Sequence, residues 1–204
     1  MEKISDPEEF KPSYKILEIS EAEKQKHIFP THEAKIHEAE RLKAEGNEFF
    51  NQKEYKKAFS CYHKVFFMIN GILDPRDEIS KYSLKGTESV TSEILEKVKE
   101  LKYSCFLNMS QIDIFNKKYG KAMERASKSL AIKKSIKGFY RRGIAYIELN
   151  EFDKARKDLE NVREMENAAG IEKNDDLDQK FLLLKQKEKA YDEQFRSKFK
   201  NMFN

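Results

Sequence analysis

The feature that most constrains the fold is a spacing that occurs three times along the chain. A small residue (Gly46, Ser110 or Gly143) is followed nine positions later by an aromatic residue and three positions after that by an alanine. The aromatic residues are Tyr55, Tyr119 and Phe152, and the alanines are Ala58, Ala122 and Ala155. A small residue lets two helices approach closely, and alanine fits a tight crossing that a larger side chain would push apart. Each segment is therefore predicted to be a helix–turn–helix unit.

The separations between the three units indicate the kind of repeat. The step from Ser110 to Gly143 is essentially the period of the tetratricopeptide repeat (TPR), about 34 residues, whereas the step from Gly46 to Ser110 is nearly twice as long. We therefore expect an all-α TPR superhelix with repeats at about 32–72, 92–133 and 135–165. An insertion at about 73–91 is expected to lengthen the second helix of the first repeat and the first helix of the second.

Both ends of the chain are predicted to differ from the repeats. Residues 1–30 form an N-terminal extension, in which Tyr14–Ile19 has a short strand-like pattern, and residues 31–204 form the TPR domain. After the third repeat, a break and a cap near Asn174 precede a long helix at about 175–203. Part of its apolar stripe should cap the hydrophobic face that a terminal repeat leaves open. The stripe consists of Leu177, Phe181, Leu184, Tyr191, Phe195, Phe199 and Phe203.

Charge and hydropathy exclude several classes of function. Forty Lys and Arg residues oppose 36 Asp and Glu residues, and the two signs are interspersed, so net charge gives no argument for nucleic acid or membrane. The longest apolar run, Val65–Ile69, is far shorter than the roughly 20 residues of a membrane span, and the first residues lack the apolar core of a signal peptide. We expect a soluble, cytoplasmic monomer that binds neither nucleic acid nor membrane.

The sequence also lacks a pattern for catalysis or metal binding. There is no Gly-rich phosphate loop, nucleophile elbow or Ser/Cys–His constellation. Cys61 and Cys105 lie far apart in the sequence on apolar helix patterns, which indicates reduced packing thiols. The histidines show no HExxH motif and no carboxylate at metal-ligand spacing; they are His27, His32, His37 and His63. We therefore predict a protein that is not an enzyme and binds no cofactor or metal.

Four short motifs, together with the long insertion, form a specific combination. The motifs are Lys43-Ala-Glu-Gly46-Asn47, Phe106-Leu-Asn108, Lys137-Gly-Phe-Tyr-Arg141-Arg142-Gly143 and Phe199-Lys-Asn-Met-Phe203. Over roughly residues 14–204, the chain resembles the C-terminal TPR half of the large FK506-binding immunophilins and related small TPR-only proteins. Tyr14–Ile19 resembles the last strand of the isomerase domain that precedes the repeats in that family. The segment before Tyr14 is much too short to form that domain, so we do not expect the family's prolyl isomerase activity.

The resemblance implies a peptide-binding site on the first helices of the three repeats. In the family, five residues form a two-carboxylate clamp for the C-terminal Glu-Glu-Val-Asp (EEVD) of Hsp90- and Hsp70-type chaperones. The matching positions here are Lys43, Asn47, Asn108, Lys137 and Arg141. By the resemblance, Lys43, Asn47 and Asn108 hold the terminal carboxylate. Lys137 and Arg141 hold side-chain carboxylates and peptide oxygens, and their spacing of four places both on one helix face.

Other interpretations of these residues remain open. The five could instead be a solvated basic face with two asparagines that serve turns or helix packing. Asp113 stands where the repeat pattern usually has an aromatic residue, and its carboxylate either weakens the clamp or points to solvent.

The last helix carries basic residues beside its aromatics, a pattern shared by calmodulin targets and anionic-surface binders. A capping helix with a soluble face is favoured, because Glu188, Asp192 and Glu193 interrupt the positive charge. The basic residues are Lys185, Lys187, Lys189, Arg196, Lys198 and Lys200.

The favoured function is therefore a co-chaperone adaptor. It would dock the acidic C-terminal peptide of a chaperone in its groove and use its outer surface, insertion or N-terminal segment for a second, unidentified protein partner. The alternative is a TPR structural subunit built into a larger assembly, with the clamp incidental, because TPR folds are general scaffolds.

Overall fold

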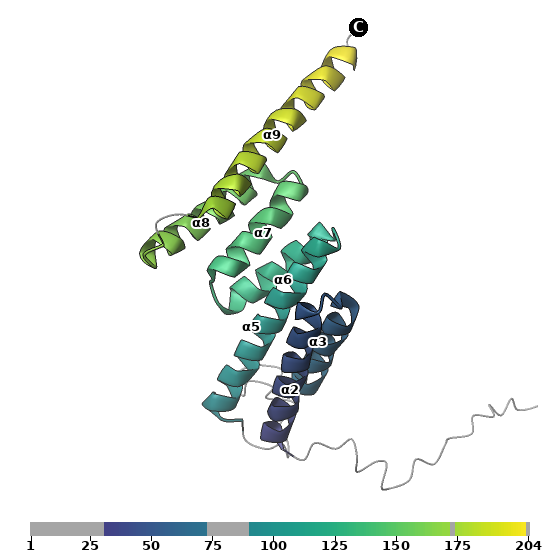
Figure 1. Cartoon of the computed structure of the whole chain (residues 1–204), viewed down its shortest axis with the longest axis vertical. Helices are drawn as coiled ribbons and strands as arrows, with labels where there is room; N and C mark the ends of the chain where they lie inside the picture. Colours follow the sequence, from purple (N-terminus) through teal and green to yellow (C-terminus); the bar gives the residue numbers. More distant parts are fainter. Residues whose placement is uncertain (1–30, 73–89, 172–173, 203–204) are drawn as a thin grey trace, which may run out of the picture. The chain divides into compact units, whose positions relative to one another are not determined.

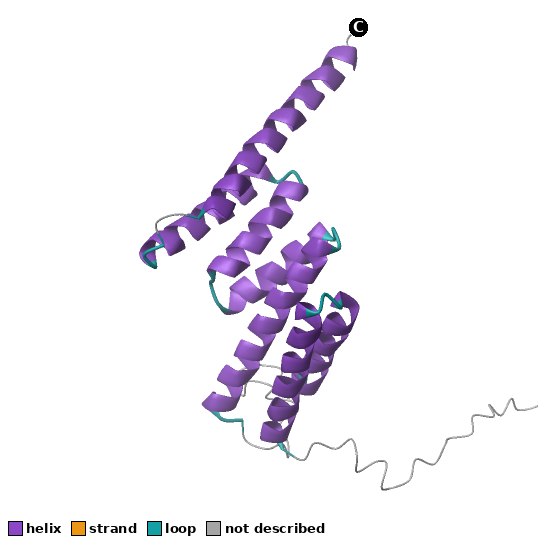
Figure 2. Ribbon diagram, in the orientation of Figure 1, coloured by secondary structure: helices purple, strands orange, loops and turns teal. Residues whose placement is uncertain are grey.

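The computed structural model describes residues 31–72, 90–171 and 174–202, and these ranges are helical apart from short turns and ends (Figures 1 and 2). The described helices are α2 (His32–Asn51), α3 (Tyr55–Ile69), α5 (Ser92–Phe115), α6 (Tyr119–Ile132), α7 (Ile136–Glu148), α8 (Phe152–Ala168) and α9 (Asp175–Met202). They form three antiparallel hairpins, α2–α3, α5–α6 and α7–α8, followed by the long helix α9. This arrangement confirms the predicted all-α class. The strand-like segment Tyr14–Ile19 lies outside the described residues.

The first helix of each hairpin begins at a hydroxyl cap. The side chains of Thr31, Thr91 and Ser135 each accept a hydrogen bond from the backbone N–H three residues later. Such caps satisfy one of the backbone donors that a helix N-terminus leaves unpaired. The caps therefore fix where α2, α5 and α7 start, and with them the register of the residues that these helices carry.

The three hairpins share one turn. Lys53, Lys117 and Asn150 occupy the same position in the repeat and all adopt a left-handed backbone conformation, with φ of 61°, 57° and 61°. In each turn the following residue donates its backbone N–H to a carbonyl of the preceding helix, at 2.8–2.9 Å. This geometry ends one helix and reverses the chain within a few residues.

Alanine closes each hairpin crossing, as the repeated spacing predicts. Ala58, Ala122 and Ala155 are each 0% exposed. Ala58 and Ala155 belong to two hydrophobic clusters, the first formed mainly by α2, α3 and α5 and the second by α7, α8 and α9. Because α5 packs on α2 and α3, and α7 packs on α5 and α6, the three hairpins stack in sequence order.

The expected effect of the insertion on the helices is only half correct. Helix α5 has 24 residues against 13 in α7, so the first helix of the second repeat is indeed long. Helix α3 is not lengthened: it has 15 residues, close to the 14 of α6. It ends at Ile69 because Asn70 is extended and Gly71 adopts a left-handed φ of 86°, which a glycine tolerates without steric cost.

Helix α9 covers the end of the stack through the first part of its apolar stripe. Leu177 and Leu184 are buried against α7 and α8, whereas Tyr191 and Phe195 are exposed. The side chains of the last two stripe residues lie outside the described part of the chain. The first half of the stripe therefore covers the end of the third repeat.

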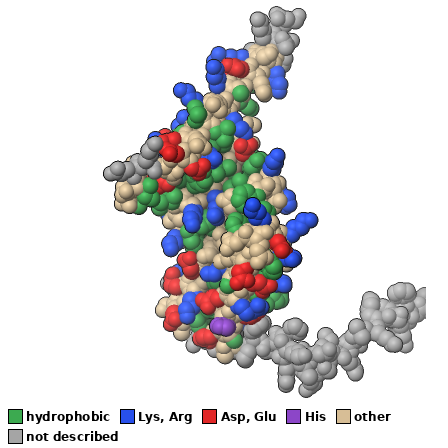
Figure 3. Space-filling model, viewed as in Figure 1, with side chains coloured by type: hydrophobic (Ala, Val, Ile, Leu, Met, Phe, Trp, Pro, Cys, Tyr) green, Lys and Arg blue, Asp and Glu red, His purple; other side chains and the backbone are tan. Residues whose placement is uncertain are grey.

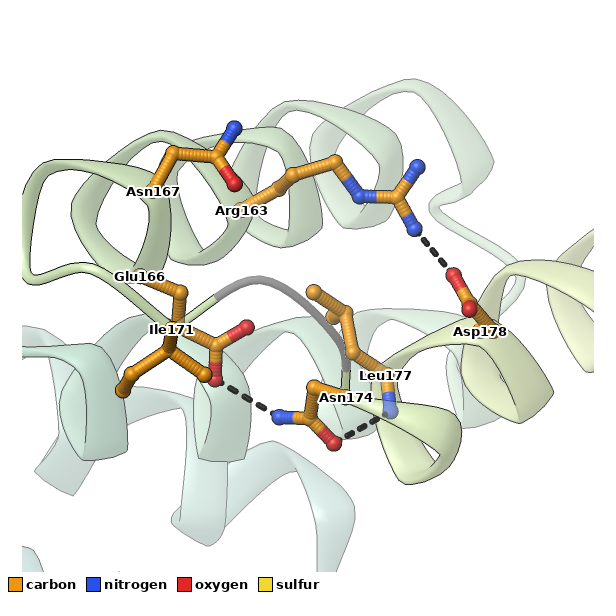
Figure 4. A pocket seen from close by; sticks show the side chains of 7 residues that line it. All are labelled: Arg163, Glu166, Asn167, Ile171, Asn174, Leu177 and Asp178. Carbon is orange, nitrogen blue, oxygen red and sulfur yellow. Dashed lines mark hydrogen bonds and ion pairs between the residues drawn. The ribbon is translucent and has the colours of Figure 1, made fainter.

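Polar contacts fix the junction between α8 and α9 (Figure 4). The buried carboxylate of Glu166 accepts a hydrogen bond from Asn174 Nδ2 at 2.6 Å, and Asn174 Oδ1 caps α9 by accepting from the N–H of Leu177 at 3.1 Å. An ion pair between Arg163 and Asp178 also joins the two helices.

Among the described helices, none combines the length and apolar character needed to cross a lipid bilayer.

Candidate functional site

The five predicted site residues lie on the first helices of the three hairpins, which pack side by side. Lys43 and Asn47 lie on α2, Asn108 lies on α5, and Lys137 and Arg141 lie on α7. Helix α5 contacts both α2 and α7. We call the surface defined by these five residues the clamp face.

Two of the predicted residues are joined directly, and a third residue completes the group. Asn108 Nδ2 donates to Asn47 Oδ1 at 3.0 Å, and the hydroxyl of Tyr62 on α3 donates to the same oxygen at 2.8 Å. Asn108 Nδ2 also lies 3.4 Å from the Tyr62 oxygen. Because the carbonyl oxygen of Asn47 already accepts two hydrogen bonds, its Nδ2 group remains to donate to a ligand.

Tyr62 is the residue of this group that the motifs did not indicate. It is 0% exposed, and burial raises the pKa of its hydroxyl to about 12, so the hydroxyl stays protonated and able to donate. Gly46 makes room for its ring, because a Cβ at Gly46 would lie 2.8 Å from Tyr62 Cε1. The available signal was its place in the repeat frame, one helical turn after Ala58.

Arg141 is anchored by a neutral group. One guanidinium nitrogen of Arg141 donates to the backbone carbonyl of Leu107 on α5, which ties α7 to α5. Burial lowers the pKa of Arg141 to about 10, while Tyr103 and Tyr62 act in the opposite direction. In the described ranges no carboxylate pairs with this guanidinium. Arg141 is thus a half-buried group, charged at neutral pH, whose burial no carboxylate of the described residues offsets.

The two lysines of the clamp face differ in their surroundings. Lys43 is half-buried, and its charge acts on the buried thiol of Cys105, whose pKa burial raises to about 12. Lys137 is exposed near the start of α7. Neither ammonium group forms an ion pair with a carboxylate in the part of the chain that the structure describes. The clamp face therefore comprises three cations and two amides, groups whose hydrogen-bond donors suit anionic ligands.

Asp113 lies in an environment that the sequence analysis did not consider. It is 2% exposed and forms an ion pair with Arg125 of α6, whose guanidinium lies 4.8 Å from the centre of the Phe59 ring. Burial raises the pKa of this carboxyl, and Arg125 opposes that shift. The expectation that this carboxylate points to solvent is therefore wrong, because it lies within the helix packing with Arg125 as its partner. The alternative that it weakens the clamp stays a prediction.

A largely apolar pocket begins one helical turn beyond the clamp face. Gln111 follows Asn108 by three residues and Ile144 follows Arg141 by three, so both lie next to the clamp residues on their helices. The pocket has a volume of about 340 Å³. Its lining comes from α5, α7 and α9: Gln111, Ile114, Phe115, Tyr140, Ile144, Ile147, Glu148, Lys180 and Leu183.

Charges elsewhere on the surface are largely mixed. On the face shown in Figure 3, acidic and basic side chains are interspersed. Basic residues of α9 take part in ion pairs: Lys187 lies 2.6 Å from Glu148, and Lys189 lies 3.9 Å from Glu193. Electrostatic selection of a ligand would therefore depend on a small group of residues and not on an extended surface of one sign.

The remaining cysteines and histidines do not form a second site in the described ranges. Cys61 and Cys105 are buried and unbridged. His32 is buried in α2, His37 and His63 are exposed, and His27 lies outside the described residues. Among the residues that the structure describes, no three His, Cys, Asp or Glu side chains are grouped as a metal site would require.

Sequence comparison finds relatives that share part of the chain. No family model matches the sequence. The peptidyl-prolyl cis-trans isomerase FKBP4 of Rattus norvegicus is 26% identical over 134 residues, which are 65% of this chain and 26% of the relative. The Homo sapiens FKBP4 is 25% identical over 134 residues, with the same shares. The chain thus matches about a quarter of the length of these relatives.

Solved structures with the same arrangement of helices are also found. The C-terminal TPR-containing domain of an FK506-binding protein of Plasmodium falciparum matches with a TM-score of 0.65 and 27% identity, over 80% of this chain and 96% of that domain. The first TPR of Spaghetti (RPAP3), solved with the HSP90 peptide SRMEEVD, matches with a TM-score of 0.51 and 23% identity, over 74% and 92% of the two chains. At 23% identity, the match to the Spaghetti (RPAP3) domain is evidence of a shared fold alone.

Proposed function

The chain is a tetratricopeptide-repeat domain that resembles the TPR half of FK506-binding immunophilins, and we propose that it is a co-chaperone adaptor. Its ligand is the acidic C-terminal peptide of an Hsp90- or Hsp70-type chaperone, bound on the clamp face through two carboxylates. The adaptor acts by binding alone and uses no cofactor. We place it in the cytoplasm, where such chaperones occur, and assign it a second protein partner on another surface.

The observation that supports this proposal most directly is the environment of the Arg141 guanidinium. Its guanidinium is half-buried without a carboxylate partner in the described ranges, and its bond to the carbonyl of Leu107 holds it in place. A charge that is partly removed from water without an opposite charge nearby is costly, and a ligand carboxylate would offset part of that cost. A solvated basic face would have no reason to fix a cation in this way.

The arrangement of donors suits a peptide that ends in a free carboxylate. Lys43, Asn47 and Asn108 supply one charge and two amides for the terminal carboxylate, and the amides add donors without adding repulsion. Lys137 and Arg141 meet the acidic side chains that precede it. A few charged hydrogen bonds at about 1.5–3 kcal/mol each, less the cost of ordering a peptide, are compatible with micromolar affinity, about −8 kcal/mol.

Two further points support the same ligand class. The first TPR of Spaghetti (RPAP3), which shares the fold, was solved with the peptide SRMEEVD. The apolar pocket beyond Arg141 and Asn108 would accommodate an uncharged side chain upstream of the acidic residues, such as the methionine of that peptide. The acidic end and the apolar residue would then occupy adjacent parts of one surface.

Calorimetry with SRMEEVD in free-acid and amidated forms tests the proposal. We expect micromolar binding of the free acid and little binding of the amide. Arg141→Ala should weaken binding of the free acid by about 1.5–3 kcal/mol, the range for a lost charged hydrogen bond. Lys157→Ala on α8 is a matched control, because Lys157 is exposed and lies outside the clamp face. Equal affinity for the two forms, or no binding at millimolar peptide, would favour the structural-subunit alternative.

A further inference from the structure

The buried hydroxyl of Tyr62 occupies a central position under the clamp face. It reaches from α3 to Asn47 on α2 at 2.8 Å and lies 3.4 Å from Asn108 Nδ2 on α5. Three helices from two repeats therefore meet at one polar group inside a hydrophobic cluster. A buried polar group with satisfied hydrogen bonds specifies one local arrangement, because any alternative leaves a donor or acceptor unpaired.

An asparagine amide has two chemically different ends, and only one of them suits an anion. Nδ2 donates hydrogen bonds, whereas Oδ1 accepts them and repels a carboxylate. At Asn47 the hydroxyl of Tyr62 and the Nδ2 group of Asn108 both donate to Oδ1. An exchange of the two ends of the amide would set the Nδ2 groups of Asn47 and Asn108 against each other, and it would leave the buried O–H group of Tyr62 without the oxygen to which it donates. The Tyr62 bond therefore favours one of the two amide orientations.

We infer that Tyr62 is a positioning residue for the clamp, whose hydroxyl orients the amides of Asn47 and Asn108 so that N–H groups meet the terminal carboxylate of the ligand. This inference rests on the proposed function. Tyr62 does not contact the ligand, because its side chain is fully buried. It acts through Asn47, and it links the second helix of the first repeat to a site that is otherwise built from first helices.

Tyr62→Phe tests the role because it removes the hydroxyl and keeps the ring that fills the space beside Gly46. We expect the affinity for free-acid SRMEEVD to fall by about 3- to 10-fold, as for one lost neutral hydrogen bond. The weak affinity for the amidated peptide should not change. Tyr146→Phe is the matched control, because Tyr146 is a half-buried tyrosine of α7 outside the Asn47–Asn108 group.

A double-mutant cycle separates positioning from general packing. If Tyr62 acts through Asn47, then Tyr62→Phe should cause little further loss in a chain that already carries Asn47→Ala. In the peptide-free protein, the side-chain amide NMR signals of Asn47 and Asn108 should shift or broaden in Tyr62→Phe. Asn47→Asp provides a second variant if Tyr62→Phe folds poorly: it keeps the acceptor for Tyr62, lacks the N–H group, and should bind at least about 10-fold more weakly.

The outcomes distinguish this inference from the proposed function. If the unsubstituted chain binds the free acid but Tyr62→Phe binds it equally well, the positioning role is wrong and the clamp stands. Additive losses in the cycle or unchanged amide signals would overturn the role in the same way. Full binding by Asn47→Asp would contradict both the role of Tyr62 and the assignment of Asn47 to the clamp. If the unsubstituted chain does not distinguish the free acid from the amide, the proposed function fails and this inference with it.

Discussion

Arg142 of α7 and Asp158 of α8 form a two-point ion pair, with Nε 2.7 Å from Oδ2 and Nη2 2.8 Å from Oδ1. Asp158 is 3% exposed, so the pair lies within the third hairpin. The preceding residue, Arg141, contacts the carbonyl of Leu107 instead. Two consecutive arginines therefore have different surroundings: Arg142 is neutralised within its own hairpin, and Arg141 has no carboxylate partner among the described residues.

This difference predicts opposite effects of two substitutions. Asp158→Ala should lower the free energy of unfolding by about 3 kcal/mol, because it leaves the charge of Arg142 buried without a partner. Arg141→Ala should change stability much less, because burial of its charge already costs free energy that the substitution recovers. Chemical denaturation followed by circular dichroism measures both. Equal losses for the two variants would contradict the division into a structural and a ligand-binding arginine.

Gly46→Ala should be destabilising although alanine is the better helix former. The propensity gain is about 1 kcal/mol, but the new Cβ would lie 2.8 Å from Tyr62 Cε1 and 3.1 Å from Cys61 Cβ. Both neighbours are buried, and overpacking of this kind costs about 1–3 kcal/mol. Gly120→Ala is the control, because its Cβ would have no neighbour within 4 Å. The melting temperature should fall for Gly46→Ala and should stay the same or rise for Gly120→Ala.

Much of the fold could be predicted because the repeat frame depends on local sterics. A small residue, an aromatic and an alanine at fixed offsets specify a helix crossing whatever surrounds it, and Ala58, Ala122 and Ala155 are fully buried as expected. The expected lengthening of α3 was wrong because Gly71, just before the insertion, was not recognised as a stop signal. A single glycine with a left-handed φ ends a helix without any change in the apolar pattern before it.

The site was harder to predict because its chemistry depends on contacts between helices. The five clamp residues came from the resemblance, and their role in binding stays a prediction. Asp113 was misjudged because its partner, Arg125, lies on the opposing helix α6, beyond the turn that separates the two. Tyr62 was missed because a tyrosine on an apolar helix face is indistinguishable by pattern from a packing residue; only the position of its hydroxyl shows a second role.

Peptide affinity should be nearly constant between pH 6 and 8.5. The pKa of Arg141 is lowered by burial to about 10, so its guanidinium stays charged throughout this range and would lose its charge only near pH 10. The carboxylates of the ligand, with ordinary pKa values of about 3.5–4.3, are also fully charged there. Calorimetry at three pH values checks this expectation. A change of more than about 3-fold with a midpoint near pH 6.5 would instead implicate a histidine.

The charge of Arg141, which is expected to favour peptide binding, should lower the free energy of unfolding of the peptide-free protein. A basic group whose pKa is lower in the folded than in the unfolded state disfavours folding while it is charged, so Arg141 destabilises the free protein in full below pH 10, and this cost falls progressively between pH 10 and the ordinary arginine pKa of 12.5. A ligand carboxylate should reduce the cost at neutral pH. Added free-acid peptide should therefore raise the melting temperature at pH 7.5, and by less in Arg141→Ala.

Salt should separate the contributions of the two cations of α7. Lys137 is exposed, so its attraction to a ligand carboxylate is about 0.2–1 kcal/mol and is screened as the Debye length shrinks from about 8 Å at physiological salt to about 3 Å at 1 M. Arg141 is partly buried and fixed to α5, so its interaction is screened much less. The loss of affinity in Lys137→Ala should therefore almost vanish at 1 M salt, whereas most of the loss in Arg141→Ala should persist. Affinities measured at both salt concentrations with free-acid SRMEEVD decide this. If the two losses decline in parallel, Arg141 binds as an exposed charge and its burial has no role in holding the peptide.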